Sequence, residues 1–281
     1  MVEIKNKRYE EERSLYNLKD TSIVNCIFKG EKDGESPLKE ARNIKVLDSS
    51  FSLRYPLWHV IDFEVNDTSF DEYSRAPIWY SKNGTFDSCS LNSIKAIREC
   101  DNIIFKDSNI ESNEFGWKSS NIKLIDSEIV SEYIFLDSSN VELHNVKFKG
   151  KYSFQYMHDL LIEDSILDTK DAFWHSNKVV VKNSIVKGEY LAWYSDDLTF
   201  INCAIIGTQP FCYCKNLKLI NCQMLDTDFS FEYSDVDAEI KGNIMSIKNP
   251  RSGRIVCDSV DDIILEDAIY EDHCEIIIRN K

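Results

Sequence analysis

Apolar and polar residues alternate in short segments that return again and again along the chain. Each segment begins with Asn or Asp, continues apolar-x-apolar, and ends with Asn/Asp, Ser/Cys, one further residue and an apolar residue, as in Asn102–Ile110. Alternation with a period of two is typical of strands, and the apolar positions are rich in the β-branched and aromatic residues that strands prefer. The pattern therefore predicts short strands and leaves no room for a helix of normal length.

The segments recur at a constant interval along most of the chain. With Asn102 as position zero, every step as far as Asp235 equals 19 (121 − 102, 140 − 121 and so on). Three steps are longer: Asp20–Asn43 (43 − 20 = 23), Asp62–Asn83 (83 − 62 = 21) and Asp235–Asp262 (262 − 235 = 27). A period held over about thirteen units indicates a repeat architecture that covers nearly the whole chain.

A coil of short parallel strands accounts for this period best. The sequence predicts an all-β chain in the form of a single-stranded parallel β-helix, a solenoid of about thirteen turns in which like residues stack at the strand spacing of ~4.8 Å. Position zero should form an Asn/Asp ladder. No linker interrupts residues 1–281, so we expect one domain, with coils over 20–270 and end caps over 1–19 and 271–281, where the pattern is absent.

Aromatic residues concentrate at two neighbouring positions of the repeat. All five tryptophans stand at position minus four, and position minus three is almost wholly titratable or phenolic. Position minus two is mostly small, which suits a crowded interior. Because adjacent strand residues point to opposite sides, we expect the tryptophans to face inward with position minus two, and position minus three to face outward. Lys39 and Arg98 would then point inward without partners, and the opposite orientation stays open.

Either orientation places a strip of aromatic and charged side chains on one face. Contiguous exposed aromatics are unusual on a soluble monomer and suit a long ligand such as a sugar chain, or a protein partner. The predicted ligand contacts are Glu40, His59, Tyr156, Phe173, Tyr190, Tyr194, Tyr213 and Glu232. The alternative is that these positions pack beneath the terminal segments.

Several local strings resemble a known family. The strings are Gly34-Glu-Ser-Pro-Leu-Lys-Glu40, Tyr55-Pro-Leu-Trp58, Lys170-Asp-Ala-Phe-Trp174, Gly188-Glu-Tyr-Leu191 and Gly207-Thr-Gln-Pro210. Together they are similar to a bacterial domain-of-unknown-function family of right-handed parallel β-helix proteins. The resemblance implies a right-handed, pectate-lyase-like architecture, and the wider superfamily looks rich in polysaccharide lyases and hydrolases. It implies no established activity, cofactor or catalytic residue.

Two sets of residues are candidates for catalysis at a sugar. Glu99 and Asp137 stand two turns apart, about 9–10 Å at the strand spacing, with Lys118 between them. Paired carboxyls at a comparable separation cleave glycosidic bonds, but a surface ladder of ion pairs would look the same. His175 lies between tyrosines with Asp171 four positions earlier, which suits a general base or a plain polar surface residue.

Cysteine usage and charge exclude other classes of function. The nine cysteines lack the spacing of a zinc site, and Cys203 and Cys222 replace serine at an inward small position, so we expect buried, reduced thiols with no metal and no cofactor. The net charge of −15 disfavours nucleic acid and acidic lipid surfaces. The charged start of the chain and the lack of a long apolar run predict a cytoplasmic protein without a membrane span.

The sequence thus predicts a cytoplasmic β-helix protein that binds a carbohydrate on its aromatic face. An enzyme of this kind would be a glycoside hydrolase or a polysaccharide lyase, but the residues leave catalysis open. The alternative is a non-catalytic scaffold that uses the same face to bind a protein or a second copy of itself.

Overall fold

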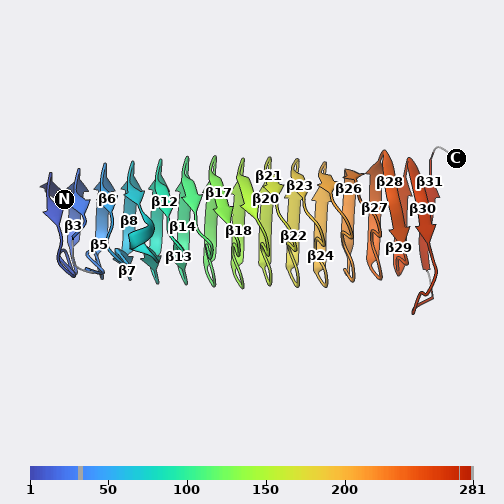
Figure 1. The fold of residues 1–281 in the computed structure, drawn as a ribbon, viewed down its shortest axis with the longest axis horizontal. Helices are drawn as coiled ribbons and strands as arrows, with labels where there is room; N and C mark the ends of the chain where they lie inside the picture. Colours follow the sequence, from blue (N-terminus) through green and yellow to red (C-terminus); the bar gives the residue numbers. More distant parts are fainter. Residues whose placement is uncertain (31–33, 272, 280–281) are drawn as a thin grey trace. The chain divides into compact units, whose positions relative to one another are not determined.

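The computed structural model describes residues 1–30, 34–271 and 273–279, and the chain forms two compact units, Met1–Val146 and Lys147–Lys281. The strands of each unit follow one another in chain order (Figure 1). The elements of the first unit are β1 (Val2–Lys5), β2 (Arg8–Tyr9), β3 (Lys19–Val24), β4 (Ile27–Phe28), β5 (Arg42–Leu47), β6 (Ser50–Phe51), β7 (Leu57–Trp58), β8 (Ile61–Asn66), β9 (Ser69–Phe70), the 3₁₀ helix η1 (Glu72–Ser74), β10 (Ile78–Trp79), β11 (Lys82–Asp87), β12 (Ser90–Asn92), β13 (Ile97–Arg98), β14 (Asp101–Lys106), β15 (Asn109–Glu111), β16 (Ser120–Ile125), β17 (Glu128–Ser131) and β18 (Ser139–His144).

The second unit continues in the same style. Its elements are β19 (Lys147–Gly150), β20 (His158–Glu163), β21 (Ile166–Asp168), β22 (Asn177–Lys182), β23 (Ile185–Lys187), β24 (Asp196–Ile201), β25 (Ala204–Ile206), β26 (Leu217–Leu225), β27 (Asp235–Lys241), β28 (Asn243–Lys248), β29 (Ser252–Cys257), β30 (Ser259–Ile264) and β31 (His273–Ile278). Within the described residues, no helix has the length and apolar character of a membrane span.

The strands pair in parallel, each with the strand one repeat later. Ile103 of β14 lies opposite Ile122 of β16, and Val179 of β22 lies opposite Leu198 of β24. The register in both units therefore equals the period of the sequence (122 − 103, 198 − 179). The chain makes about 14 turns of a parallel β-solenoid. The predicted fold class, period and number of turns are confirmed.

The coils reach further toward both ends of the chain than the sequence pattern indicates. Val2–Lys5 pair in parallel with Thr21–Val24, and His273–Ile278 pair in parallel with Ser252–Cys257. Val2–Lys5 and His273–Ile278 lie in the segments that we expected to act as caps, and both form strands of the coils.

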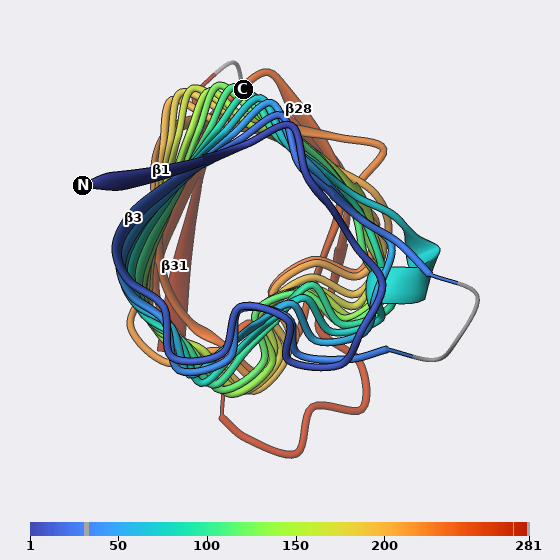
Figure 2. The same cartoon turned by 90° about the vertical axis from the view of Figure 1, so that its left-hand side faces the viewer.

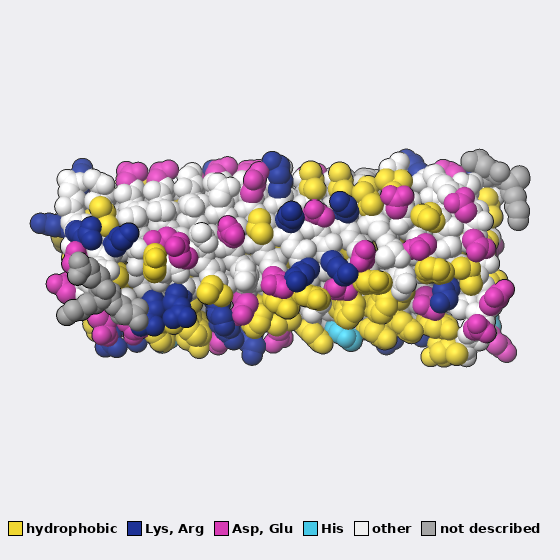
Figure 3. Space-filling view, viewed as in Figure 1, with side chains coloured by type: hydrophobic (Ala, Val, Ile, Leu, Met, Phe, Trp, Pro, Cys, Tyr) yellow, Lys and Arg dark blue, Asp and Glu magenta, His cyan; other side chains and the backbone are white. Residues whose placement is uncertain are grey.

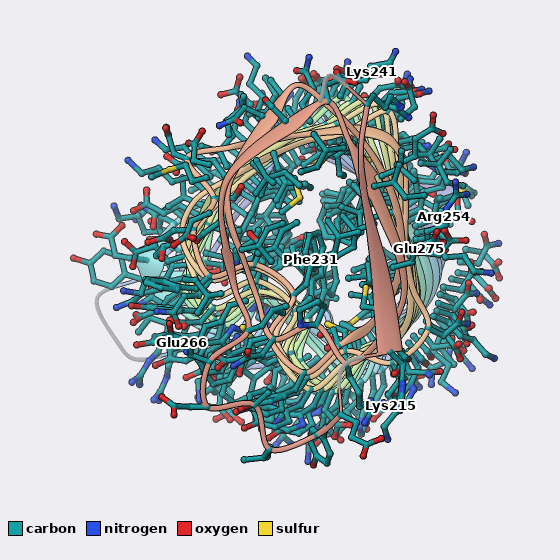
Figure 4. The ribbon with its side chains drawn as sticks, turned by 90° about the vertical axis from the view of Figure 1, so that its right-hand side faces the viewer. Lys215, Phe231, Lys241, Arg254, Glu266 and Glu275 are labelled. Atoms are coloured by element: carbon teal, nitrogen blue, oxygen red, sulfur yellow. The ribbon has the colours of Figure 1, made fainter. Side chains whose placement is uncertain are left out.

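The interior is filled by the apolar positions of the strands. Positions plus one and plus three are buried from the unit of Asp20 to that of Asp235, whereas Ile263 and Leu265 of the last unit are exposed. Aromatic rings stack inside from turn to turn, with Phe28 and Phe51 4.4 Å apart and Phe86 and Phe105 4.7 Å apart between ring centroids. In the second unit, Phe231 lies inside the coil whereas Lys215 and Arg254 lie outside (Figure 4). Burial of this continuous apolar column is the main force that holds the turns together.

Polar ladders run beside the apolar column. Position zero forms the predicted Asn/Asp ladder, in which Asn102 donates to Asn83 at 3.0 Å and Asn216 donates to Asp197 at 2.5 Å. These residues have positive φ, which Asn and Asp tolerate better than most residues. A second ladder of serines is buried, and the hydroxyl of Ser184 accepts from the Ser165 amide at 3.0 Å. The ladders satisfy backbone groups that the turns would otherwise leave unpaired.

The segment before position zero departs from the predicted alternation. Asp171, Phe173 and His175 have φ of 51°, 64° and 55°, and the same left-handed triplet recurs in other turns of the second unit, as at Tyr190, Ala192 and Tyr194. Because every second residue of these turns is left-handed, the chain winds there instead of running extended, and side chains stop alternating. Positions minus five and minus two are buried as far as Cys214, while position minus four faces outward as far as Trp193 and position minus three as far as Tyr213.

The orientation predicted for the tryptophans is therefore wrong. Trp174 and Trp193 are half-buried on the outer side, as are Trp58, Trp79 and Trp117, whereas Cys212 and Phe231 at the same position are buried. Arg98 packs its guanidinium against the Trp117 ring at 5.3 Å instead of pointing into the core. The outward orientation predicted for position minus three is confirmed, since its members are exposed or half-buried.

Candidate functional site

Five aromatic side chains of the second unit form one stack on the outer side of the coils, which we name the aromatic row: Tyr156, His175, Tyr194, Tyr213 and Tyr233. The first four rings are nearly parallel. Their successive centroid distances are 5.0, 5.4 and 4.6 Å, with interplanar angles of 12°, 9° and 8°. The last ring, at 5.5 Å, is tilted by 39°. This regularity follows from the repeat, because each turn places the same position at the strand spacing.

Backbone hydrogen bonds fix the row. The amide of Tyr156 donates to the Trp174 carbonyl at 2.9 Å, and the amide of His175 donates to the Trp193 carbonyl at 3.1 Å. The amide of Tyr194 continues the series to the Cys212 carbonyl at 3.1 Å. Each residue of the row is thus tied to the turn that carries the next one, so the row is preorganised before any ligand arrives.

The last member of the row differs from the prediction. Sequence register places Glu232 after Tyr213, but Tyr233 takes this place, one position later than the period requires. Glu232 instead pairs with Lys248 at 2.9 Å. Tyr213 and Tyr233 are 20 residues apart, one more than the period, but Leu217 and Val236 of the following strands are again 19 apart. Because the spacing of the strands is unchanged, the period in the sequence does not reveal the shift.

The outer edges of the row are open to solvent. Tyr156 and Tyr194 are each 49% exposed. Within the described part of the chain, the hydroxyls of Tyr156, Tyr194 and Tyr213 have no hydrogen-bond partner, whereas that of Tyr233 donates to the Asp267 carbonyl at 3.4 Å. Hydrophobic side chains gather along the lower part of this unit in Figure 3. Since the ring faces cover one another, the row offers ring edges and free polar atoms.

Two tryptophans and Tyr190 border the row. Trp174 and Trp193 stack at 5.4 Å with an angle of 4°, and Tyr190 meets the Trp193 ring edge-on at 5.6 Å. The indole nitrogens are used internally, because those of Trp174 and Trp193 donate to the carbonyls of Tyr190 and Gln209 at 2.6 and 2.9 Å. Tyr190, a predicted ligand contact, is half-buried in this border.

Phe173 is not a ligand contact, contrary to the prediction. It is 0% exposed and stacks inside the coil on Phe154 at 5.4 Å. The left-handed backbone described above turns position minus five inward, while position minus three stays outside. The prediction failed because it assumed strand alternation in a segment that is not a strand.

Asp171 and His175 do not form the predicted acid–base pair. Asp171 is 8% exposed, and no hydrogen bond or ion pair joins the two side chains among the residues the structure describes. Burial raises the pKa of the Asp171 carboxyl, which Lys170 partly offsets. The Asp171 carboxyl is therefore buried within its own turn and is not part of the aromatic row.

A carboxylate and an imidazole do meet in the first unit, at Glu40 and His59. His59 Nδ1 lies 2.8 Å from Glu40 Oε1, and Arg42 Nη2 lies 3.2 Å from Glu40 Oε2. Burial alone would raise the pKa of Glu40, but the hydrogen bonds with His59 and Arg42 outweigh it and lower this pKa. The His59 ring also packs on Tyr80 at 5.2 Å. Both residues stand at position minus three, one repeat apart (59 − 40 = 19), which accounts for their proximity.

Glu99, Lys118 and Asp137 lie on successive turns of the first unit. The amide of Glu99 donates to the Trp117 carbonyl at 2.9 Å, and that of Lys118 to the Leu136 carbonyl at 3.0 Å. Glu99 has its nearest cation in Arg98, at 3.7 Å. Lys118 forms no ion pair with Glu99 or Asp137 in the described structure. Glu99 is half-buried, and Lys118 and Asp137 are exposed, so the three side chains face outward on these turns.

Eight of the nine cysteines are buried, and Cys274 is half-buried. Cys203 and Cys222 are buried as predicted, with their thiols donating to the carbonyls of Val181 and Phe200 at 3.4 Å each. Burial raises the pKa of Cys100 and of Cys214 to about 12. The described residues hold no group of three or more His, Cys, Asp or Glu side chains suited to a metal ion.

A cleft in the first unit was missed by the sequence reasoning. It has a volume of about 750 Å³, and Lys29, Arg54, Glu72, Tyr73, Arg75 and Ile94 line it. A smaller cavity of about 200 Å³ adjoins it at Arg75 and Ile94. The available signal was the pair of long repeat steps in this unit, since extra residues in a repeat project from one face of the coil.

Several solved structures align with the chain at low sequence identity. The tailspike protein of E. coli bacteriophage HK620 aligns with a TM-score of 0.50 and 9% identity over 93% of this chain and 60% of that chain. PfbA, a surface adhesin of Streptococcus pneumoniae, aligns with a TM-score of 0.44 and 9% identity over 80% and 86% of the two chains. The mannuronan C-5 epimerase AlgE4 A-module of Azotobacter vinelandii aligns with a TM-score of 0.38 and 11% identity. The alignment covers 98% of this chain and 88% of that chain.

At the level of sequence, no curated protein matches the chain. The family described as "Protein of unknown function (DUF3737)" matches residues 2–278. The chain therefore belongs to the DUF3737 family.

Proposed function

We propose that this protein binds a carbohydrate and that an extended, neutral glycan lies along the aromatic row. The observation that carries the proposal is the series of free polar edges on Tyr156, His175, Tyr194 and Tyr213, repeated at centroid distances of 5.0, 5.4 and 4.6 Å. A sugar unit of an extended glycan has a comparable length, so successive units can meet successive rings. Phenol hydroxyls and imidazole nitrogens both donate and accept hydrogen bonds, as sugar hydroxyls do.

The geometry defines how such a ligand would be held. The rings inside the stack leave no free face for a sugar plane, so contact along the row would be made by ring edges and hydroxyls, with Trp174 and Trp193 as the apolar border. The row is already rigid, which reduces the entropy lost on binding. The chain's net charge of −15 favours a neutral glycan over a polyanionic one.

The proposal assigns binding and no reaction. His175 has no carboxylate partner in the described residues, and Tyr156 and Tyr194 occupy both of its faces. A general base needs a neighbour that orients it or shifts its pKa. The His175 imidazole is therefore proposed as a hydrogen-bonding member of the row.

The test is a glycan-array screen of the wild-type chain, followed by calorimetry with the best neutral glycan. Tyr194→Ala removes one ring from the middle of the row, and Tyr16→Ala removes a tyrosine of similar exposure, 52%, from the first unit as a matched control. The proposal requires that the first variant loses affinity and the second keeps it. Binding of no glycan, with Tyr194→Ala instead disrupting self-association, would show that the row is a protein interface.

A further inference from the structure

Two tryptophans of the first unit lack a hydrogen bond that their counterparts in the repeat make. The indole nitrogens of Trp117, Trp174 and Trp193 each donate to the carbonyl of the residue 16 positions later, at 2.6, 2.6 and 2.9 Å. Those of Trp58 and Trp79 are buried and have no acceptor among the described residues. Buried donors are nearly always paired, so an unpaired donor at a position that is paired in other turns indicates an acceptor from outside the chain.

The Trp79 side chain borders the small cavity beside the cleft of this unit. The cavity has a volume of about 200 Å³, and its lining consists of Tyr55, Arg75, Ala76, Trp79, Ile94 and Lys95. Lys95 stands 16 positions after Trp79 (95 − 79), so the residue whose carbonyl accepts in the other turns is part of the same wall. The unpaired indole and the cavity therefore form one site.

The cavity lies where the repeat is longer than its usual period. Glu72–Ser74 form η1 within the long step between Asp62 and Asn83 (83 − 62 = 21), and Figure 2 shows η1 projecting outside the coils. Arg75 follows η1 with φ 54° and ψ −70°, a conformation that non-glycine residues rarely adopt and that is commonest at functional sites. Inserted residues of a solenoid often form its binding face, which suits a ligand contact at Arg75.

Arg75 brings a positive charge to the cavity wall. In the described part of the chain its guanidinium forms no ion pair and no hydrogen bond. Lys95 and Arg98, in contrast, both lie close to Glu114, with nitrogen–oxygen distances of 3.1 and 3.6 Å. Glu72 lines the larger cleft, and this cavity is lined without it. The charges of Lys95 and Arg98 are thus compensated within the protein, whereas that of Arg75 is available to an anion.

The other walls of the cavity are aromatic and apolar. Tyr55 meets Trp58 edge-on at 5.6 Å and Trp79 at 6.1 Å, and the two indole rings stack at 5.8 Å with an angle of 19°. These contacts hold the Trp79 ring in place before any ligand arrives. Ala76 is buried, whereas Ile94 is 49% exposed, so the cavity opens to solvent beside Ile94.

We infer that this cavity binds a short-chain carboxylate, for which butyrate is a suitable probe. The Arg75 guanidinium can hold the carboxylate by strong charge-assisted hydrogen bonds, and the Trp79 indole N–H can donate to one of its oxygens. The apolar walls suit a short hydrocarbon chain. The volume of about 200 Å³ is below the ~300–1,000 Å³ of sites for drug-sized ligands, which limits the ligand to a few heavy atoms. The site shares no residue with the aromatic row and does not depend on the proposed function.

The test is an NMR titration of the full chain with sodium butyrate that follows the indole N–H signals of the tryptophans. The Trp79 signal should shift and saturate, whereas those of Trp174 and Trp193, which donate to backbone carbonyls, should stay in place. Butanol keeps the hydrocarbon chain and lacks the charge, so it should bind at least tenfold more weakly. Sodium chloride at equal concentration corrects for ionic strength.

Two variants test the two polar contacts by calorimetry with butyrate. Arg75→Gln should weaken binding at least tenfold, the effect of losing a charged hydrogen bond. Trp79→Phe keeps an aromatic ring and removes the N–H, so it should weaken binding about fivefold, the effect of losing one neutral hydrogen bond. The same variant identifies the Trp79 signal in the spectrum, because that signal disappears.

Matched controls separate the site from general effects of charge and folding. Lys82→Gln removes an exposed cation of the same unit outside the cavity, and Trp117→Phe removes an indole N–H that donates to the Tyr133 carbonyl; both should bind butyrate like the wild type. The melting temperature of every variant checks that it is folded. The inference is overturned if high millimolar butyrate leaves the Trp79 signal in place, if butanol binds as tightly as butyrate, or if Arg75→Gln binds as well as Lys82→Gln.

Discussion

The imidazole of His175 lies face to face with the phenol ring of Tyr194, with centroids 5.4 Å apart and planes within 9°. The two residues are one repeat apart (194 − 175 = 19), so the contact follows directly from the period. The same turn places the Trp174 and Trp193 rings 5.4 Å apart beside them. One period in the sequence thus creates parallel stacks in space, and the predictions below depend on which stack a residue joins.

Tyr194→Ala should weaken glycan binding about thirtyfold, because a central aromatic contact commonly accounts for ~2 kcal/mol of binding free energy. Tyr194→Phe keeps the stack and removes the hydroxyl, so its loss should be smaller, about fivefold, the effect of one hydrogen bond. Calorimetry of both variants with the glycan from the array measures the two losses. Equal affinity of Tyr194→Ala and wild type would refute a role for the row in glycan binding.

Phe173→Ala should lower the free energy of unfolding by about 3–5 kcal/mol, because it leaves a cavity in the apolar column. Ala192 occupies the same position one turn later with φ 61°, so alanine fits the backbone and the loss comes from the missing ring. Urea denaturation followed by tryptophan fluorescence measures the change. Glycan affinity of the folded variant should stay at the wild-type value; a selective loss of affinity with normal stability would contradict the buried placement of Phe173.

Glu40→Gln should destabilise the protein at pH 7 by about 1 kcal/mol, because it removes the charge that pairs with His59 and Arg42. The pKa of Glu40 is lowered in the folded state, so its stabilisation is present above the ordinary value of 4.5 and is lost as the pH falls through the lowered pKa. The melting temperatures of Glu40→Gln and the wild type, measured from pH 3 to 8, should therefore converge at the acid end of this range. Glu64→Gln, which loses an exposed pair with Lys45, is the matched control and should change little.

Asp171→Asn should act in the opposite direction and stabilise the protein at pH 7 by about 1 kcal/mol, because it removes a poorly solvated charge. Burial raises the pKa of Asp171, so the carboxyl favours folding below its ordinary pKa of 3.8 and loses this contribution as the pH rises through the raised value. Asparagine tolerates the φ of 51° at this position. A melting temperature at pH 7 below that of the wild type would show that the carboxylate has a stabilising partner.

The native protein should react quickly with Ellman's reagent at one thiol at most, that of Cys274. The other eight cysteines are buried, and burial raises the pKa of Cys89 to about 11 and of Cys100 to about 12, which suppresses the reactive thiolate. Guanidinium should expose all nine thiols. Cys274→Ser should abolish the fast phase, and a fast phase of two or more thiols in the wild type would contradict the packing.

The fold was determined by the sequence to a high degree, for a simple physical reason. Strand alternation and a constant period are local and repetitive, so each copy supports the same interpretation of the others, and the register Ile103–Ile122 follows by counting. The same counting places His175 beneath Tyr194 and His59 beside Glu40. Stacks along the coil need no knowledge of the tertiary structure beyond the period itself.

Whether a residue faces in or out before position zero was decided by the tertiary structure. Left-handed residues such as Phe173 and His175 break the alternation of inward and outward side chains. The type of a non-glycine residue does not predict whether its φ is positive. The replacement of Glu232 by Tyr233 in the row depends on two shifts that cancel within one turn, so the period conceals it. The cleft likewise is lined by residues of two long repeat steps that are separated in the sequence, and only folding of the intervening turns brings Lys29 and Arg75 to its walls.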